Sequence, residues 1–238
     1  TSGIAGMNVS YGTINNGTSA GSSASVTIDN GAGLYGTNGS KLVNNGKITV
    51  ASGAGIAGIG TGRTKQEYGT DVKTSASLGG TKTVEIENHG TINAAGTGSI
   101  GIYAENNTNA PKANVTVSSD KQLTVGTDGV GIAVVSATPT SMLVNHGTSD
   151  EGGTITVTAA GTGPDIKTGV NGKGIYAQNS DITLTGNYMI ETPEKGIGIF
   201  ASKNTNVTGT LEYKYNGSTT GTGMGIIYDQ LGVASHTN

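Results

Sequence analysis

Short apolar segments introduced by glycine return along the whole chain. The longest copy is Lys195-Gly196-Ile197-Gly198-Ile199-Phe200-Ala201, and shorter copies include Gly101-Ile102-Tyr103-Ala104 and Gly174-Ile175-Tyr176-Ala177. The apolar residues that follow the glycine, taken as the anchors of the copies, are Ile4, Leu34, Ile56, Ile102, Ile132, Ile175, Ile199 and Ile226. A repeat of this length indicates a solenoid, in which each unit buries its apolar face only against its neighbours.

Each copy divides into three short extended pieces. In the clearest unit these are Thr83–Glu87, Gly90–Ala94 and Ser99–Ala104. Val84 and Ile86 alternate with polar residues, and this period of two predicts strands with one face turned inward. No window has apolar residues at helical spacing, and glycine costs about 1 kcal/mol per helical position, so we expect no long helix.

A second motif, Asn or Asp followed by Asn or His and then Gly, separates the extended pieces. Its copies are Asn15-Asn16-Gly17, Asp29-Asn30-Gly31, Asn44-Asn45-Gly46, Asn88-His89-Gly90 and Asn145-His146-Gly147. Asn and Gly tolerate the left-handed backbone region and therefore suit tight corners. We interpret most copies as corners rather than hairpins, because three strands per repeat must keep winding in one direction for the coils to stack.

The first asparagine of four of these copies has a further structural role in this interpretation. Identical amides in stacked strands can hydrogen-bond from one strand to the next. We expect Asn15, Asn44, Asn88 and Asn145 to turn inward and form such a ladder.

These patterns predict an all-β protein, a right-handed parallel β-helix of about eight coils that spans residues 1–238 as a single domain. Residues 61–81 break the rhythm and concentrate charge, which predicts a protruding loop or hairpin insertion. We treat this insertion as a candidate partner-binding segment, with a solvated loop of no function as the alternative. Its candidate contact residues are Arg63, Lys65, Glu67, Tyr68 and Asp71.

Composition narrows the possible functions. The net charge is −3 and no basic run occurs, which argues against nucleic acid and anionic membrane surfaces as partners. Cysteine is absent, so thiol chemistry and disulfides are excluded. No apolar stretch has the length of a transmembrane helix. The chain opens on Thr1-Ser2-Gly3 without a signal-type segment, and we expect it to be a fragment of a longer stack.

Carboxyl pairs are the first candidates for catalytic groups, because parallel β-helices include polysaccharide-cleaving enzymes and glycoside hydrolysis needs two carboxyls at a fixed separation. The closest pairs are Glu85/Glu87, Asp150/Glu151 and, more loosely, Glu191/Glu194. Glu85 and Glu87 are expected to face solvent on one strand. The only arginine, Arg63, has no cluster of acidic residues beside it, so we predict no catalytic site and no enzyme activity.

Metal and cofactor sites are not predicted. His89 and His146 occupy the same motif position about two coils apart, or about 10 Å, which is too far for one zinc ion. The third histidine is His236, and the glycine-rich stretches lack the aspartates of a calcium-binding repeat. We predict no cofactor.

Aromatic residues offer a candidate binding row. Tyr103, Tyr176 and Tyr228 follow the anchor position, with Phe200 in the corresponding place, so strand alternation turns them outward. We expect Tyr176, Phe200 and Tyr228 to lie in register on neighbouring coils and to contact a sugar or a protein, with plain surface packing as the alternative.

Three strands per coil, Asn-Asn-Gly corners and the step Gly196-Ile197-Gly198-Ile199 make the chain resemble the passenger region of a type V autotransporter adhesin, especially the large fusobacterial-type outer-membrane adhesins. The likeness covers nearly the whole chain and rests on the style of the repeat. It implies display at the outer surface of a Gram-negative cell, through a C-terminal barrel that this sequence lacks, and a role in cell adhesion and virulence. No site residue is carried over.

We therefore predict a non-catalytic, monomeric adhesin fragment that binds a protein or glycan on a host or bacterial cell surface, without membrane insertion of this segment. Two alternatives remain. One is a carbohydrate-active β-helix enzyme, such as a polysaccharide lyase or a tailspike-like depolymerase. The other is a stalk that only spaces a distal binding tip from the cell.

Overall fold

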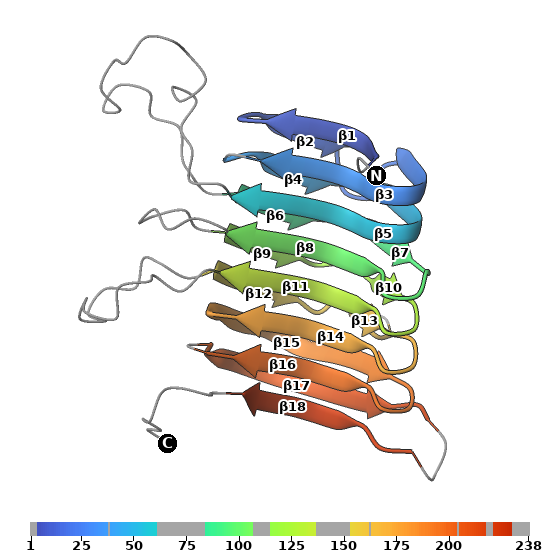
Figure 1. Cartoon of the computed structure of the whole chain (residues 1–238), viewed down its shortest axis with the longest axis vertical. Coiled ribbons are helices and arrows are strands. Elements are labelled where there is room, and N and C mark those ends of the chain that lie inside the picture. Colours follow the sequence, from blue (N-terminus) through green and yellow to red (C-terminus); the bar gives the residue numbers. More distant parts are fainter. Residues whose placement is uncertain are drawn as a thin grey trace, which may run out of the picture.

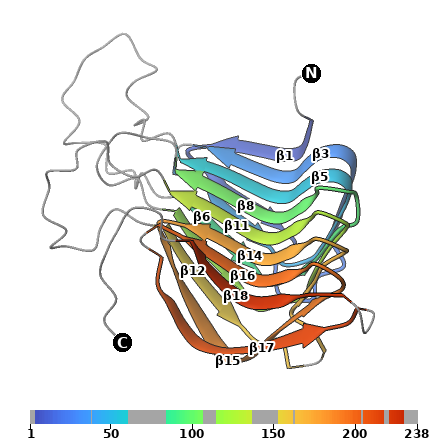
Figure 2. The ribbon, with the colours of Figure 1, turned by 60° about the horizontal axis from the view of Figure 1, so that its bottom comes forward.

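The structure is a computed structural model that describes residues 4–37, 39–60, 84–106, 115–136, 153–161, 163–203, 205–217 and 221–229. These residues contain no helix and form 18 strands of one sheet, in which the strand pairs are parallel. The strands wind round a common axis and each coil lies against the next (Figures 1 and 2). The predicted parallel β-helix is confirmed.

Each coil contributes to three sides, which we name A, B and C. Side A contains β1 (Ala5–Ser10), the second half of β3 (Ser25–Thr37), the second half of β5 (Lys47–Gly60), β8 (Ile100–Asn106), β11 (Val130–Ser136), β14 (Lys173–Gln178), β16 (Ile197–Ser202) and β18 (Met224–Asp229). In Figure 1 these strands lie one below another in chain order.

Sides B and C complete the coil. Side B contains β2 (Thr13–Asn16), β4 (Lys41–Asn44), β6 (Val84–Asn88), β9 (Val115–Ser119), β12 (Gly153–Thr158) and the first parts of β15 (Ser180–Thr192) and β17 (Val207–Tyr215). Side C contains the first halves of β3 and β5, then β7 (Thr91–Ala94), β10 (Leu123–Val125), β13 (Ile166–Lys167) and the last parts of β15 and β17.

The predicted anchors form one column on side A. Leu34 pairs with Ile56, and the column continues through Ile102, Ile132, Ile175, Ile199 and Ile226. The prediction of Ile4 as the first anchor was wrong, because Met7 and not Ile4 pairs with Leu34. Ile4 lies before β1, its carbonyl accepts a hydrogen bond from the Ala32 amide at 2.9 Å, and its side chain is 66% exposed.

The core is a narrow apolar channel between the three sides. Side B supplies a column of Ile14, Leu42, Ile86, Val117, Ile155, Ile182 and Val207. Side C supplies Val26, Ile48, Ile92, Leu123, Ile166, Ile190 and Tyr213. Similar residues stack on one another from coil to coil at about 4.8 Å. A small number of large side chains is therefore enough to fill the interior.

Glycine precedes the anchors of the inner coils because the backbone of the next coil, and at most of these positions a side chain of side C, leaves no space for a side chain there. A Cβ added to Gly174 would lie 2.5 Å from the Gly198 carbonyl oxygen of the next coil and 2.5 Å from Cγ2 of Ile190 on side C. A Cβ added to Gly101 would likewise lie 2.5 Å from the Gly131 carbonyl oxygen of the next coil. Any larger residue would displace either the neighbouring backbone or the opposite column.

The asparagine ladder exists, but its first member is Asn16 and not Asn15. Asn16 pairs with Asn44, while Asn15 pairs with Val43 and is exposed. The corner in the first coil therefore starts one residue later than the motif suggested. Asn145 and the predicted insertion at residues 61–81 lie outside the described residues.

Candidate functional site

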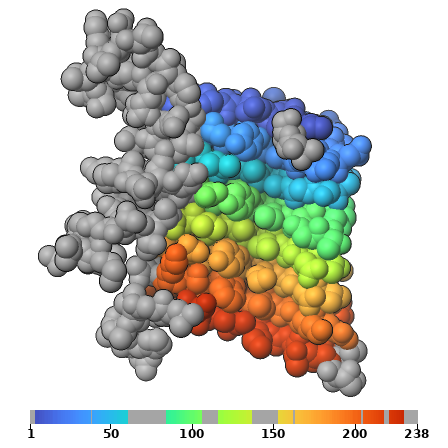
Figure 3. Space-filling view, viewed as in Figure 1, coloured from blue at the N-terminus to red at the C-terminus, as the bar shows by residue number. Residues whose placement is uncertain are grey.

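The outer face of side A carries a column of aromatic residues alternating with alanine. From the second coil onward the residues in register are Tyr35, Ala57, Tyr103, Ala133, Tyr176, Phe200 and Ile227. The four aromatic rings are half-buried, and Ala57 and Ala133 are buried between them. Figure 3 shows this side of the molecule as a closely packed, nearly flat surface over its coloured part.

Tyr176 and Phe200 form the centre of the column. Their ring centroids are 5.5 Å apart and their planes differ by 12°, which is an offset-stacked arrangement. Because the rings come from adjacent coils of a parallel ladder, the sheet fixes their spacing. The predicted register of these two residues on neighbouring coils is confirmed, and their rings form a pair on the outer face.

The hydroxyls of the column are held by residues two positions further along the same strand. Tyr103 donates a hydrogen bond to Glu105 Oε2 at 2.7 Å, and Tyr176 donates to Gln178 Oε1 at 3.5 Å. Burial, reinforced by the Glu105 carboxylate, raises the pKa of Tyr103 well above its ordinary value. Tyr103 therefore presents a neutral ring, and the two hydrogen bonds orient the rings of Tyr103 and Tyr176.

Further apolar residues flank the aromatic column. Ile100, Val130 and Ile197 reach the surface on one side of it, and Ile59 and Val135 on the other, all half-buried. In the strand register, Lys173 lies between Val130 and Ile197, and Glu105 lies between Ile59 and Val135. None of these five residues belongs to the core cluster or packs against it. The column and these five residues together form a surface that we call the outer apolar face.

Tyr228 does not belong to this row. It pairs with Ala201, one residue out of step with Phe200, and Ile227 takes the outward position. The prediction that Tyr176, Phe200 and Tyr228 lie in register was therefore wrong for Tyr228. Its place is in the inward column with Ala177 and Ala201, where its side chain is 50% exposed.

Sequence reasoning missed most of the outer apolar face. Tyr35 was not selected, although it follows the anchor Leu34 as Tyr103 follows Ile102. Ile100, Val130 and Ile197 were missed because two-residue alternation assigns them to the inside, and the irregular strand at each glycine is invisible in the sequence. Arg63, Lys65, Glu67, Tyr68 and Asp71 lie outside the described residues.

The carboxyls of Glu85 and Glu87 are bound to one lysine on side B. Lys41 Nζ lies 3.1 Å from Glu85 Oε1 and 2.6 Å from Glu87 Oε1. The hydrogen bond from Lys41 holds the pKa of Glu87 below its ordinary value, and the bond to Glu87 raises the pKa of Lys41. Both carboxyls are partly exposed and form ion pairs with Lys41. Glu85 and Glu87 therefore make a charged surface contact between coils.

His89 continues this charged group. Its Nδ1 lies 3.0 Å from Asp120 Oδ2, and its Nε2 lies 3.8 Å from Glu87 Oε2. Within the described ranges, no three His, Asp or Glu side chains converge as metal ligands. His146, His236, Asp150 and Glu151 lie outside those ranges.

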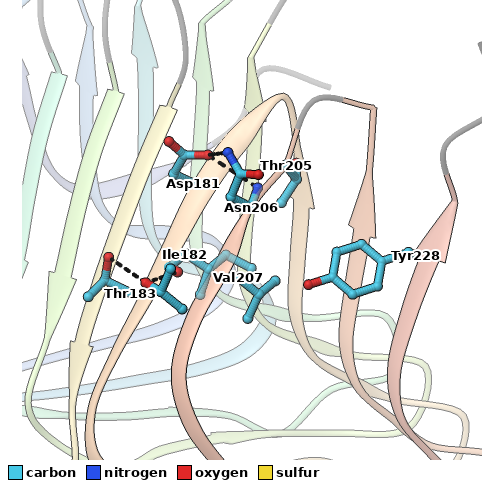
Figure 4. A pocket seen from close by; sticks show the side chains of 8 residues that line it. Asp181, Ile182, Thr183, Thr205, Asn206, Val207 and Tyr228 are labelled. Atoms are coloured by element: carbon cyan, nitrogen blue, oxygen red, sulfur yellow. Dashed lines mark hydrogen bonds between the residues drawn. The ribbon is translucent and has the colours of Figure 1, made fainter. Parts of the chain in front are cut away.

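A hollow of about 540 Å³ lies at the edge of side B, where β15 and β17 run side by side (Figure 4). Asp181 and Asn206 meet at its rim: Asp181 Oδ1 accepts hydrogen bonds from the Asn206 side-chain amide at 3.0 Å and from its backbone amide at 3.2 Å. Thr183, Thr208 and Tyr228 also line this hollow.

Across the described part of the chain, no helix has both the length and the apolar character needed to span a membrane. Comparison with known proteins yields no relative: no protein-family model, no curated protein and no solved structure matches this chain.

Proposed function

We propose that this chain is a non-catalytic adhesin segment that binds a protein or glycan on another cell through the outer apolar face. The observation that carries the proposal is the column of half-buried aromatic rings on the outside of side A, with aliphatic residues on both of its sides, which the core does not use. Apolar side chains gathered at a protein surface mark interaction sites.

The chemistry of the face suits contact with a partner. Aromatic side chains with few rotatable bonds are the residues that dominate binding energy at interfaces. The stacked pair of Tyr176 and Phe200 is already ordered by the sheet, so little conformational entropy is lost on binding.

The size of the face suits a weak contact. Seven strands of side A at about 4.8 Å, with about five residues each at about 3.3 Å, give about 500 Å². Stable interfaces bury about 800 Å² per partner, so one copy would bind transiently and many copies on a surface would bind strongly.

Localisation follows from the resemblance of the repeat to autotransporter passengers and stays part of the proposal. A β-helix reaches length by adding coils, each stabilised by its neighbours, and thereby makes a rigid rod. Such a rod at the outer surface of a Gram-negative cell would hold the outer apolar face away from that cell and toward a partner.

The test is a binding measurement with a double variant, Tyr176→Ser with Phe200→Ser. Fluorescently labelled protein would be titrated on cultured mammalian cells and on whole bacteria by flow cytometry, with far-ultraviolet circular dichroism as the check of folding. We expect wild type to bind saturably and the variant to bind at least about tenfold more weakly.

The matched control is Thr27→Ser with Thr91→Ser, which changes two exposed residues on side C and leaves side A intact. Equal binding of the aromatic double variant and wild type would contradict the proposal. That result would favour a stalk, which spaces a distal tip and binds nothing itself.

A further inference from the structure

The later coils of side B expose a regular array of hydroxyl groups. Thr154, Thr156 and Thr158 of β12 are exposed and alternate with the buried Ile155 and Val157. Thr156 pairs with Thr183, which pairs with Thr208, and Thr158 pairs with Thr185. We call this surface, with the half-buried Thr116 and Ser118 of β9, the threonine face; its members are Thr116, Ser118, Thr154, Thr156, Thr158, Thr183, Thr185 and Thr208.

The array has two fixed repeats. Neighbouring coils are about 4.8 Å apart, and outward residues on one strand follow each other at about 6.6 Å. Because threonine is branched at Cβ, its side chain has little freedom at χ1 on a strand. The face therefore presents hydroxyls and methyls in ordered rows parallel to the axis of the solenoid.

Most of these hydroxyls are available to a ligand. Thr208 bonds to the Ile182 carbonyl oxygen at 3.2 Å and to Thr183 Oγ1 at 3.4 Å. Among the described residues, Thr154, Thr156, Thr158 and Thr185 make no side-chain hydrogen bond, although each hydroxyl can donate one bond and accept two.

Charge distinguishes this part of side B from the earlier coils. There, Lys41, Glu85 and Glu87 occupy the outer face, where the single lysine pairs with both carboxylates. The rows of the threonine face contain one acidic residue on the last coils, Asp181, which pairs with Thr154 in the strand register. Such a surface suits an uncharged, hydrogen-bonding ligand and gives no attraction to a polyanion.

The hollow at the edge of β17 adjoins this surface and extends to the inward side chains of Ile182, Val207 and Tyr228. Thr183 and Thr208 line it together with Asp181 and Asn206. Asn206 fixes the Asp181 carboxylate through Oδ1, and the other carboxylate oxygen accepts no hydrogen bond from the described residues. In Figure 4 the Tyr228 ring stands across from these polar groups. A volume of about 540 Å³ lies within the range of small-ligand sites.

From these observations we infer that the threonine face binds an uncharged polysaccharide, whose chain lies parallel to the solenoid axis with about one sugar per coil. Sugar hydroxyls exchange hydrogen bonds with the threonine hydroxyls, and the C–H faces of the rings contact the threonine methyls. A hydroxyl of the sugar that reaches the hollow donates a hydrogen bond to Asp181 Oδ2, the carboxylate oxygen that Asn206 does not contact. This site lies on side B and is separate from the outer apolar face.

Two hydroxyls at the centre of the array provide the test. Thr156→Val with Thr183→Val removes both hydroxyls while keeping the branched shape and the strand preference of the residues. The matched control, Thr27→Val with Thr91→Val, makes the same change at two exposed threonines on side C. Equal thermal midpoints and far-ultraviolet circular dichroism spectra establish that all three proteins are folded.

The probes are insoluble cellulose and chitin in pull-down assays, and cellohexaose and chitohexaose in isothermal titration. We expect wild type and the control to bind one of the two polymers and the threonine double variant to bind it at least about tenfold more weakly. Asp181→Asn should weaken binding of the corresponding hexasaccharide.

Absence of wild-type binding to both polymers and both oligosaccharides would overturn the inference. Undiminished binding by the threonine double variant would also overturn it. The Tyr176→Ser, Phe200→Ser variant separates this inference from the proposed adhesion site, because it should lose cell binding and keep polysaccharide binding.

Discussion

Asn16 donates its side-chain amide to Asn44 Oδ1 at 2.8 Å, and Asn44 donates in turn to Asn88 Oδ1 at the same distance. The Asn88 side-chain amide donates a hydrogen bond to Ser119 Oγ at 3.0 Å. All four side chains are buried at the inner edge of side B. These bonds join the amide of each coil to the next coil, which ties the register of one coil to the next.

Replacing Asn44 by alanine should destabilise the protein by about 2–4 kcal/mol, because it leaves the Asn16 donor and the Asn88 acceptor buried without their partners. The free energy of unfolding would be measured by urea denaturation, from the midpoint and the slope of the transition. Asn15→Ala is the control, since Asn15 is exposed and its replacement should change stability by less than about 0.5 kcal/mol. A larger loss for Asn15 than for Asn44 would contradict the observed register.

Tyr188→Phe should stabilise the protein by about 1 kcal/mol. The Tyr188 side chain is buried, and its hydroxyl has no hydrogen-bond partner among the described residues, so removing the oxygen relieves an unsatisfied polar group. Burial and the nearby Asp165 raise the pKa of Tyr188 well above its ordinary value, so the ring is neutral.

Tyr213→Phe is the matched control for that change. Its hydroxyl lies 2.7 Å from Thr192 Oγ1 and donates to the Gly196 carbonyl oxygen at 3.1 Å, so its loss should destabilise the protein by about 1 kcal/mol. Thermal unfolding of both variants gives the comparison. A loss of stability in Tyr188→Phe would show that the hydroxyl has a partner in solution.

Gly174→Ala should destabilise the protein by about 1–3 kcal/mol through overpacking. Its new methyl would meet the Gly198 carbonyl oxygen and Ile190 Cγ2, both at 2.5 Å. Gly225→Ala in the same column is the control, because the nearest described atoms lie 3.8 Å from the added carbon. Equal midpoints for the two variants in chemical unfolding would refute close approach of the next coil and of side C as the reason for the glycine column.

Glu191→Gln should cost about 1–2 kcal/mol at neutral pH. The Glu191 side chain is 6% exposed and lies 3.4 Å from Lys167 Nζ and 3.1 Å from Lys214 Nζ, which come from the coils on either side. Burial acts to raise the pKa of Glu191, but the hydrogen bonds from Asn216 and Lys214 and the charges of both lysines outweigh it and leave the pKa below its ordinary value.

The sign of the pH dependence follows from that lowered pKa. The carboxylate contributes its full stability above the unfolded-state value of about 4.5 and loses it as the pH falls through the lower folded-state value. The difference in unfolding free energy between wild type and Glu191→Gln should therefore shrink on acidification. Glu212→Gln, at an exposed position on the next coil, is the control. A difference that stays constant down to pH about 3 would count against the ion-pair explanation.

Much of the winding could be predicted from local pattern. The unit from Val84 to Ala104 was divided correctly into β6, β7 and β8, because alternation and Gly-containing corners are local signals. The column from Leu34 to Ile226 followed from one repeated step. The errors at Ile4, Asn15 and Tyr228 are each shifts of register. A shift of one residue exchanges the inward and outward side chains of a strand.

The candidate sites were less predictable than the winding. Tyr176 and Phe200 were placed correctly on the outer face because each directly follows an anchor. Ile100, Val130 and Ile197 could not be selected, since their exposure depends on the irregular strand beside each glycine. The threonine face went unnoticed because each Thr-x-Thr segment is ordinary alone, and only stacking of β9, β12, β15 and β17 gathers them into an array.

The sequence by itself determined that short strands of period two wind with a glycine before each inward anchor, because these signals depend on neighbouring residues alone. The tertiary structure decided which residue of one coil lies over which residue of the next. That register is set by hydrogen bonds and packing between segments 20 or more residues apart, such as Asn16 with Asn44 and Tyr176 with Phe200. Surface function depends on it, since a face of the solenoid exists only after the coils have aligned.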